Sequence, residues 1–146
     1  MLDSIKQKLE QINLIDSTEF KKAGVLIILM REEGLDDLQI LFTKRSSNLS
    51  THSGEVSFPG GKWEKGDTDL YQTALRESNE EIDLDTNNIQ RLGALNYLLS
   101  RHKIEVHPYI GYLNKYQNFS GNYEIDEIFT VPLLSLIHIS EPTRRR

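Results

Sequence analysis

The hydrophobic residues at the amino terminus recur with the spacing of one helical face. They lie three or four positions apart: Leu2, Ile5, Leu9 and Ile12. This period is typical of an amphipathic helix that packs one side against a core. Polar residues 16–18 then interrupt the pattern. We expect residues 1–22 to form this helix and a lead-in to the domain that follows.

A hairpin is predicted next. Residues 23–30 (AGVLIILM) are continuously apolar, which is typical of a strand covered on both faces. Residues 39–44 (QILFTK) predict its partner, and residues 32–37, with one glycine and four carboxylates, predict the turn. Residues 46–53 are polar and predict a loop. A short strand over residues 55–58 then ends at a Pro-Gly-Gly sequence.

The period of the hydrophobic pattern changes between residues 69 and 82. Apolar or small residues there lie at helical spacing: Leu70, Ala74, Leu75, Ser78 and Ile82. Asp67 or Thr68 can cap the amino end of this helix. Asp83 stands where the helix should end, a position that favours residues tolerant of positive φ.

Three further strands are predicted over residues 92–99, 104–113 and 125–131. Strands outnumber helices, and one helix lies among them along the chain. The sequence contains no internal repeat and no interdomain linker. We therefore expect one α/β domain over residues 23–133, with a mixed sheet and helices on its faces.

Composition narrows the functional classes. The chain has 146 residues, 38% of them hydrophobic, which suits one globular domain. It has no cysteine, which excludes disulfides, iron–sulfur sites and a thiol nucleophile. A net charge of −5 argues against nucleic acid as a partner. The longest apolar run, Val25–Met30, is too short to span a membrane. We expect a cytoplasmic protein with no membrane partner, since the amino terminus lacks a signal-peptide pattern.

The carboxyl terminus reads as foreign sequence. Residues 134–144 read LSLIHISEPTR, which matches the translation of a transposase adapter used in sequencing libraries. We expect the natural coding sequence to be interrupted near Leu133, so that the domain is truncated and residues 134–146 are a non-native tail. Such a segment is set aside in reasoning about the fold. The alternative is a native basic tail.

The strongest chemical signal is a cluster of carboxylates on the predicted helix. Glu77, Glu80 and Glu81 lie at i, i+3 and i+4, so they share one helical face. Like charges at this spacing repel, so they do not stabilise an isolated helix. Hard divalent cations such as Mg²⁺ and Mn²⁺ prefer oxygen ligands of this kind, and Mg²⁺ also binds substrate phosphates. The alternative is a solvated acidic helix face.

This helix and the turn before it resemble the Nudix box, G-x5-E-x7-R-E-U-x-E-E-x-G-U, in which U is a bulky apolar residue. The matching residues are Gly61, Arg76, Glu77, Glu80, Glu81 and Leu84. Asp67 replaces the first glutamate, with one extra residue before Arg76. Ser78 replaces an apolar residue, and Asp83 replaces the last glycine. None of these departures removes a carboxylate from the helix cluster.

A second motif resembles the coenzyme A pyrophosphatase branch of the Nudix hydrolases, whose signature is L-L-T-x-R-S-x3-R-x3-G-x-V-x-F-P-G-G. The matching residues are Leu41, Thr43, Arg45, Ser46, Gly54, Val56, Phe58, Pro59, Gly60 and Gly61. Phe42 replaces a leucine, and Ser50 replaces an arginine that could contact phosphate. The longer box found here is also a feature of that branch. The resemblance covers residues 23–133.

The resemblance implies a Nudix-type α/β/α sandwich with its catalytic helix at about residues 69–82. It implies hydrolysis of the pyrophosphate bond in a nucleoside diphosphate derivative, here coenzyme A or one of its derivatives. The products would be 3′,5′-adenosine bisphosphate and 4′-phosphopantetheine. The implied cofactor is Mg²⁺ or Mn²⁺, held by Glu77, Glu80 and Glu81, with Glu77 and Glu81 pointing most nearly together.

The resemblance also assigns roles outside the metal site. Arg76 would orient a glutamate of the cluster. Either a glutamate of the box or one from a later loop would act as general base, and Glu124 is the candidate in the later loop. The residues expected to contact substrate are Arg45, Ser46, His52, Gly60 and Gly61.

Two other functions stay open. A Nudix pyrophosphatase acting on ADP-ribose or on dinucleotides is compatible with the missing arginine at position 50. A non-catalytic Nudix-fold nucleotide-binding module is the alternative of another class, although such a module would not need three mutually repelling carboxylates. The sequence does not decide between a monomer and a homodimer.

Overall fold

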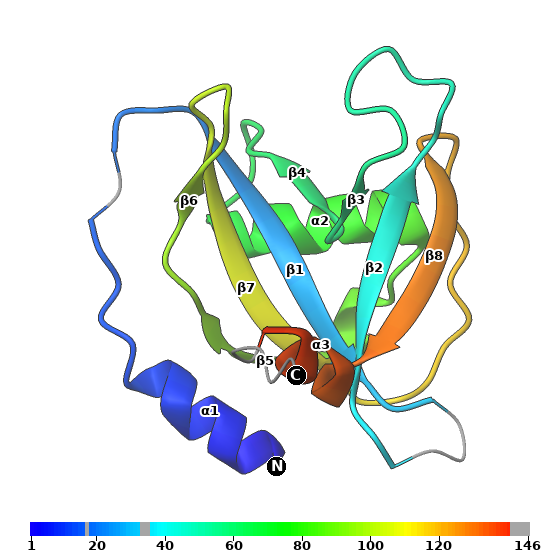
Figure 1. The fold of residues 1–146 in the computed structure, drawn as a ribbon. Helices are drawn as coiled ribbons and strands as arrows, with labels where there is room; N and C mark the ends of the chain where they lie inside the picture. Colours follow the sequence, from blue (N-terminus) through cyan, green and yellow to red (C-terminus); the bar gives the residue numbers. More distant parts are fainter. Residues whose placement is uncertain (17, 33–35, 141–146) are drawn as a thin grey trace, which may run out of the picture.

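The protein folds around one mixed β-sheet (Figure 1). The computed structural model describes residues 1–16, 18–32 and 36–140, without the side chains of residues 137–140. Its helices are α1 (Leu2–Glu10), α2 (Leu70–Ile82) and α3 (Leu133–Ser140), with a 3-10 turn at Thr86–Asn88. Its strands are β1 (Lys22–Met30), β2 (Gln39–Arg45), β3 (Val56–Ser57), β4 (Gly60–Lys62), β5 (Ile89–Ala94), β6 (Leu98–Leu99), β7 (Glu105–Leu113) and β8 (Ile125–Pro132).

Strand β1 lies at the centre of the sheet and pairs with three other strands. It pairs in parallel with β7 along most of its length, which makes the sheet mixed as predicted. On its other edge it pairs with β2 only at Leu29 and Met30, and with β4 at residues 23–25. Strands β1 and β2 therefore diverge, and β4 occupies the edge of β1 that β2 leaves (Figure 1). Strand β8 extends the sheet beyond β2, and β3 pairs with the part of the other edge of β2 that β1 leaves. Strands β5 and β6 pair with β7.

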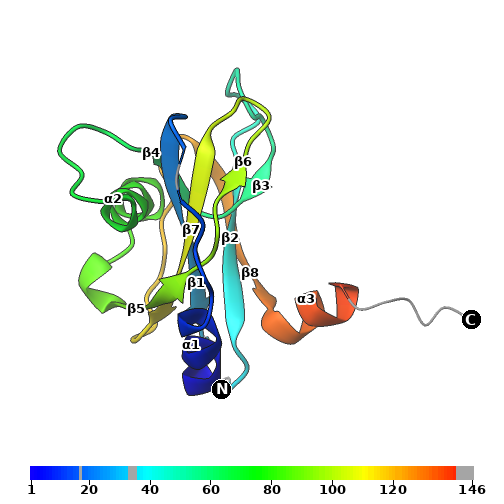
Figure 2. The same ribbon diagram turned by 90° about the vertical axis from the view of Figure 1, so that its left-hand side faces the viewer.

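Alternate residues of β1 face opposite layers of the molecule. Leu26, Ile28 and Met30 are buried in a core that includes residues of α2. Leu29 faces the other way and packs with Leu9 of α1 and with the first turn of α3. Figure 2 shows α2 and α3 on opposite sides of the sheet. This arrangement confirms the expected α/β/α architecture. Among the described residues, no helix is both long and apolar enough to span a membrane.

The ends of α2 confirm one expectation and correct another. The amino-terminal cap is Asp69, whose side chain accepts a hydrogen bond from the N–H of Gln72 at 2.8 Å. The prediction of Asp67 or Thr68 as the cap is wrong, because both side chains bond elsewhere. At the carboxyl end, Asp83 has a φ of 59°, the left-handed conformation expected there.

The predicted strand over residues 92–99 is two strands, β5 and β6. The register of β5 on β7 shifts between Arg91 and Gly93, and such a bulge bends a strand out of its ladder. Gly93 also packs against Leu9 of α1, so closely that a Cβ there would lie 2.7 Å from the Leu9 side chain. Residues 33–35 belong to the predicted turn, and residues 141–146 belong to the predicted non-native tail. Both segments lie outside the described residues.

Glu105, at the start of β7, is a fully buried carboxylate that fastens the segment before β1 to the sheet. It accepts hydrogen bonds from the N–H and the hydroxyl of Thr18 and contacts Nε2 of His107. The Lys22 ammonium lies 3.8 Å away. Burial on its own would raise the pKa of Glu105. The hydrogen bonds and Lys22 outweigh burial and lower this pKa from 4.5 to about 2.

We expect the Glu105→Gln variant to lose about 1.5–3 kcal/mol of unfolding free energy at neutral pH, because a hydrogen-bonded buried charge is lost. The native carboxylate stabilises the fold above pH 4.5 and loses this contribution as the pH falls towards 2, since its folded pKa is depressed. The variant should therefore be less sensitive to acid in that window. Urea unfolding at several pH values measures both effects. Glu10→Gln on exposed α1 is the control, and equal acid sensitivity of the two variants would contradict the prediction.

Candidate active site

The Gly-Gly sequence expected as a turn forms the start of strand β4, and its backbone lies in direct contact with the carboxylates of α2. The N–H of Gly60 donates to Oε1 of Glu81 at 3.0 Å. Gly61 lies so close to Glu77 that a Cβ on Gly61 would collide with the Glu77 carboxylate. A Cβ on Gly60 would collide with the backbone of β1. Glycine is therefore required at both positions by the close packing of β4 between β1 and α2.

Two of the three clustered glutamates are held in an environment that disfavours their charge. Burial raises the pKa of Glu77 to about 7, helped by a hydrogen bond with Glu80 and by the charge of Glu81. Burial also raises the pKa of Glu81 to about 7, against the hydrogen bond from Gly60. Glu80 is the most exposed of the three. The three glutamates share one helical face as predicted, and of its two i, i+4 members Glu81 is buried and Glu77 is partly buried.

Arg76 is the hub of the ion pairs around this cluster. Its Nε and Nη2 bind the carboxylate of Asp67 at 2.9 and 3.0 Å, and Nη2 also donates to the carbonyl of Lys62. Its Nη1 lies 3.3 Å from Glu80 and 3.7 Å from Glu77. The pairing with Arg76 drives the pKa of Asp67 well below its ordinary range. Asp67, which departs from the box glutamate, therefore orders the loop before α2.

The loop before β8 brings Glu124 close to the carboxylates of α2. The side-chain amide of Asn122 donates to the carbonyl of Glu80 at 3.1 Å, and the Asn122 N–H donates to that of Glu81 at 2.9 Å. Glu124, two residues later, has its carboxylate 3.6 Å from Arg45. The charge of Glu124 also contributes to the raised pKa of Glu81. Sequence reasoning did not identify Asn122, because its role depends on a contact between segments far apart in the chain.

The other predicted substrate residues have different surroundings. Ser46 is buried, and its hydroxyl accepts a hydrogen bond from the N–H of Asn48 within the turn. His52 is exposed, contacts Glu55 at 3.1 Å and lies edge-on to His102. Four of the predicted substrate residues adjoin the carboxylates of α2 or Glu124: Gly60, Gly61, Arg45 and Ser46. The N–H of Ser46 donates to the carbonyl of Glu124 at 2.8 Å, whereas the His52 side chain contacts only Glu55 and His102 among the described residues.

The donor set fits a divalent cation, although it is not a preformed metal site. Among the described residues, no group of three or more His, Asp or Glu side chains is arranged to hold a metal ion. Glu80 turns towards Arg76, and Glu81 is bonded to Gly60. Burial and neighbouring carboxylates raise the pKa values of Glu77 and Glu81, and a further positive charge would stabilise their ionised forms. A divalent cation supplies that charge and takes oxygen ligands, so this chemistry suits it.

Similarity to known proteins assigns this fold, with its carboxylate-bearing helix, to a family of hydrolases. The NUDIX domain model matches residues 20–136. The chain is 48% identical over 117 residues to Nudix hydrolase 15, mitochondrial, of Arabidopsis thaliana, covering 77% of this chain and 40% of that protein. The chain belongs to the NUDIX family. It spans about half or less of the length of the first curated relatives it matches.

Solved structures support the same fold. An Ap4A hydrolase binary complex from C. elegans aligns with a TM-score of 0.64 at 21% identity, covering 82% of this chain and 85% of that one. The NUDIX domain of Shewanella oneidensis NrtR, solved with ADP ribose, aligns with a TM-score of 0.63 at 18% identity. It covers 90% of this chain and 85% of that one. Likeness at these identities shows the fold and leaves the ligand to be tested.

The Asp67–Arg76 pair should contribute more to stability than the Glu64–Arg76 pair. The Asp67 side chain is 6% exposed, whereas that of Glu64 is 69% exposed and lies 3.7 Å from Arg76. We expect Asp67→Asn to lose about 2 kcal/mol of unfolding free energy, less than a fully buried pair because Arg76 is partly solvated. Glu64→Gln should lose about 0.5 kcal/mol or less. Denaturant titration of both variants checks this, and equal losses would be evidence against the ordering role of Asp67.

Metal binding should be stronger at high pH, since protons and cations compete for Glu77 and Glu81. Their raised pKa values also mean that, without metal, their ionisation lowers stability as the pH rises from 4.5 through about 7. We expect Mn²⁺ to raise the Tm more at pH 8 than at pH 6. The gain approaches about 2.7 kcal/mol when Mn²⁺ is a hundredfold above its Kd.

Calorimetry of the wild type, Glu81→Gln and the control Glu10→Gln checks this prediction. Glu81→Gln should show a smaller Mn²⁺-induced rise in Tm than the other two proteins. A rise that is the same at both pH values, or that Glu81→Gln retains in full, would place the metal elsewhere.

Proposed function

We propose that this chain is a metal-dependent Nudix hydrolase that cleaves the pyrophosphate bond of coenzyme A or its derivatives. The observation that carries the proposal is the contact of Gly60 and Gly61 with two glutamates of the box, the buried Glu81 and the partly buried Glu77. The coenzyme A branch is supported by the motif over residues 41–61, which ends with these two glycines. Membership of the NUDIX family supports the reaction class.

The substrate carries clustered negative charge, and so does the site. Glu77 and Glu81, with Glu80 after it turns from Arg76, are the proposed ligands of Mg²⁺ or Mn²⁺. The bound cation supplies neutralisation of phosphate oxygens and a water of lowered pKa. Arg45 is the proposed phosphate contact, for which its planar guanidinium is suited. In the net reaction, water adds to one phosphorus, and the bond from the bridging oxygen to that phosphorus breaks. Both products are phosphate monoesters.

Glu124 is the proposed general base. Its carboxylate is partly exposed and lies 3.6 Å from Arg45, next to the Glu77–Glu81 cluster in the fold. A base in this position accepts the proton of the attacking water, provided that it is ionised at the working pH. The role of Arg76 in this proposal is to position Glu80 and the loop that contains Asp67.

The test is incubation of the purified chain with coenzyme A and Mg²⁺ or Mn²⁺, with 3′,5′-adenosine bisphosphate measured by chromatography. We expect product that disappears with a chelator. Glu81→Gln should lower kcat by about a hundredfold or more, since partners one step further from a metal already cost 10–100-fold. Glu10→Gln is the matched control. A Glu81→Gln variant as active as this control would contradict the proposal.

ADP-ribose and dinucleotides are tested in the same assay. Faster turnover of either than of coenzyme A would replace the proposed substrate and keep the reaction class. A second chain, with native sequence in place of the proposed non-native tail at 134–146, separates truncation from lack of function. Activity only in that second chain would mean that the domain needs the residues beyond Leu133. If neither chain hydrolyses any of these substrates, the result would favour a non-catalytic nucleotide-binding module.

A further inference from the structure

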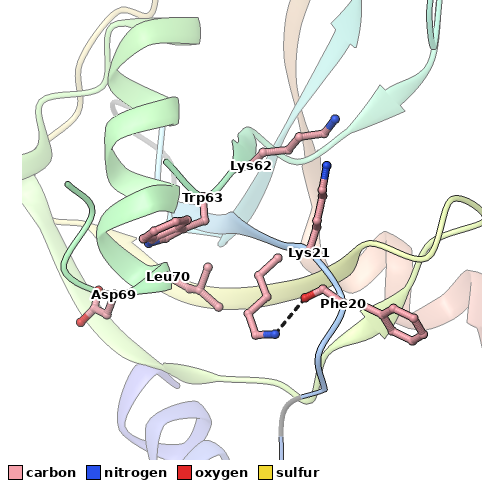
Figure 3. A pocket seen from close by; sticks show the side chains of 7 residues that line it. Phe20, Lys21, Lys62, Trp63, Asp69 and Leu70 are labelled. Carbon is pink, nitrogen blue, oxygen red and sulfur yellow. Dashed lines mark hydrogen bonds between the residues drawn. The ribbon is translucent and has the colours of Figure 1, made fainter. Parts of the chain in front are cut away.

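A groove of about 650 Å³ opens beside the amino end of α2, and the reaction proposed above does not use it. Its walls come from the segment entering β1, the end of β4 and the start of α2 (Figure 3). Two aromatic residues and three lysines are among its lining residues. This combination of exposed rings and cations is typical of surfaces that bind nucleotides.

The aromatic side chains of the groove are partly exposed to solvent. Trp63 is 48% exposed and Phe20 is 39% exposed. The indole Nε1 of Trp63 donates to the carbonyl of Asp67 at 3.2 Å, which fixes the edge of this partly exposed ring. In Figure 3 the Trp63 ring stands beside Leu70, and Phe20 lies at the opposite end of the groove. A fixed, exposed indole face suits stacking on a planar base.

Two of the three lysines have ammonium groups that are not paired with another described residue. Lys22 donates to the carbonyls of Thr18 and Phe20. Lys21 and Lys62 point towards the same side of the groove (Figure 3), and in the described part of the chain neither ammonium makes a hydrogen bond or an ion pair. Asp69 lies at the other end, with its carboxylate engaged at the helix cap. The pair of free cations suits an anion in a protein whose net charge is −5.

The groove and the carboxylate cluster are joined by β4 and α2. Lys62 follows Gly61 directly, and its carbonyl accepts a hydrogen bond from Arg76. Along α2, Leu70 in the groove precedes Glu77 by seven residues, a rise of about 10 Å. A nucleotide separates its base from its terminal phosphates over a comparable length. One bound molecule can therefore reach both places.

We propose that this groove binds the nucleoside end of the substrate, with Trp63 stacked on the base and Lys21 and Lys62 paired with a phosphate on its ribose. The proposal rests on the proposed function, because it takes the pyrophosphate to lie at the box glutamates. It predicts that a ribose phosphate distant from the reacting bond strengthens binding. Trp63 and the two lysines would then determine substrate specificity.

Trp63 is the only tryptophan of the chain, so its fluorescence reports directly on this groove. With Mg²⁺ present, we expect 3′,5′-adenosine bisphosphate to quench the emission saturably. AMP, which lacks the second phosphate, should bind about tenfold more weakly, as expected for loss of a charged hydrogen bond. Inorganic phosphate should leave the emission unchanged. Unchanged emission with the bisphosphate, or equal affinity for the bisphosphate and AMP, would overturn the proposal.

Lys62→Gln should weaken binding of the bisphosphate about tenfold. Lys115→Gln, which removes an exposed lysine outside the groove, is the matched control, and thermal unfolding checks that both variants fold. Equal affinities of these two variants would also overturn the proposal. The outcome is separable from that of the proposed reaction. Hydrolysis of coenzyme A without quenching refutes only the groove, whereas specific quenching without hydrolysis refutes only the reaction.

Discussion

The candidate site depends on one close contact, that of the Gly60–Gly61 backbone with the carboxylates of α2. No side chain separates these two glycines of β4 from the helix, so Glu81 reaches the N–H of Gly60 and Glu77 lies against Gly61. Gly24 of β1 sets the same spacing on the other side, because a Cβ there would collide with the carbonyl of Leu70. Three glycines thus fix the distance between helix and sheet. Burial of the two glutamates, and hence their raised pKa, follows from that distance.

The surrounding residues offset the cost of placing these charges together. Arg76 connects the loop before α2 with two of the glutamates, and Asp67 holds the guanidinium in place. At the carboxyl end of the helix, Asn122 satisfies carbonyls that the last turn of any helix leaves free. The divergence of β1 and β2 gives β4 its place on the edge of β1. The topology of the sheet therefore determines where the charged cluster forms.

The sequence predicted the parts of the fold that local pattern controls. The apolar run of β1, the period of α2 and the left-handed Asp83 follow from residues close in the chain, and all three agree with the structure. Motif matching also singled out the box glutamates and the two glycines, which meet in the structure, although the glycines form a strand and not the expected turn. The cap at Asp69 was missed because Asp67 had two suitable roles and only the position of Arg76 decides between them. The role of Asn122 and the groove beside the amino end of α2 could not be predicted, because each is formed by segments that meet only in the folded chain.

Asp83 has a consequence for how this sequence can change. It ends α2 in a left-handed conformation that glycine adopts without a steric cost, whereas an aspartate there is only tolerated. Aspartate and glycine codons differ by a single nucleotide at the second position. The helix that presents the carboxylates is thus one point mutation away from a stronger stop signal. This position is a place where a lineage can gain stability without altering any charged side chain of the cluster.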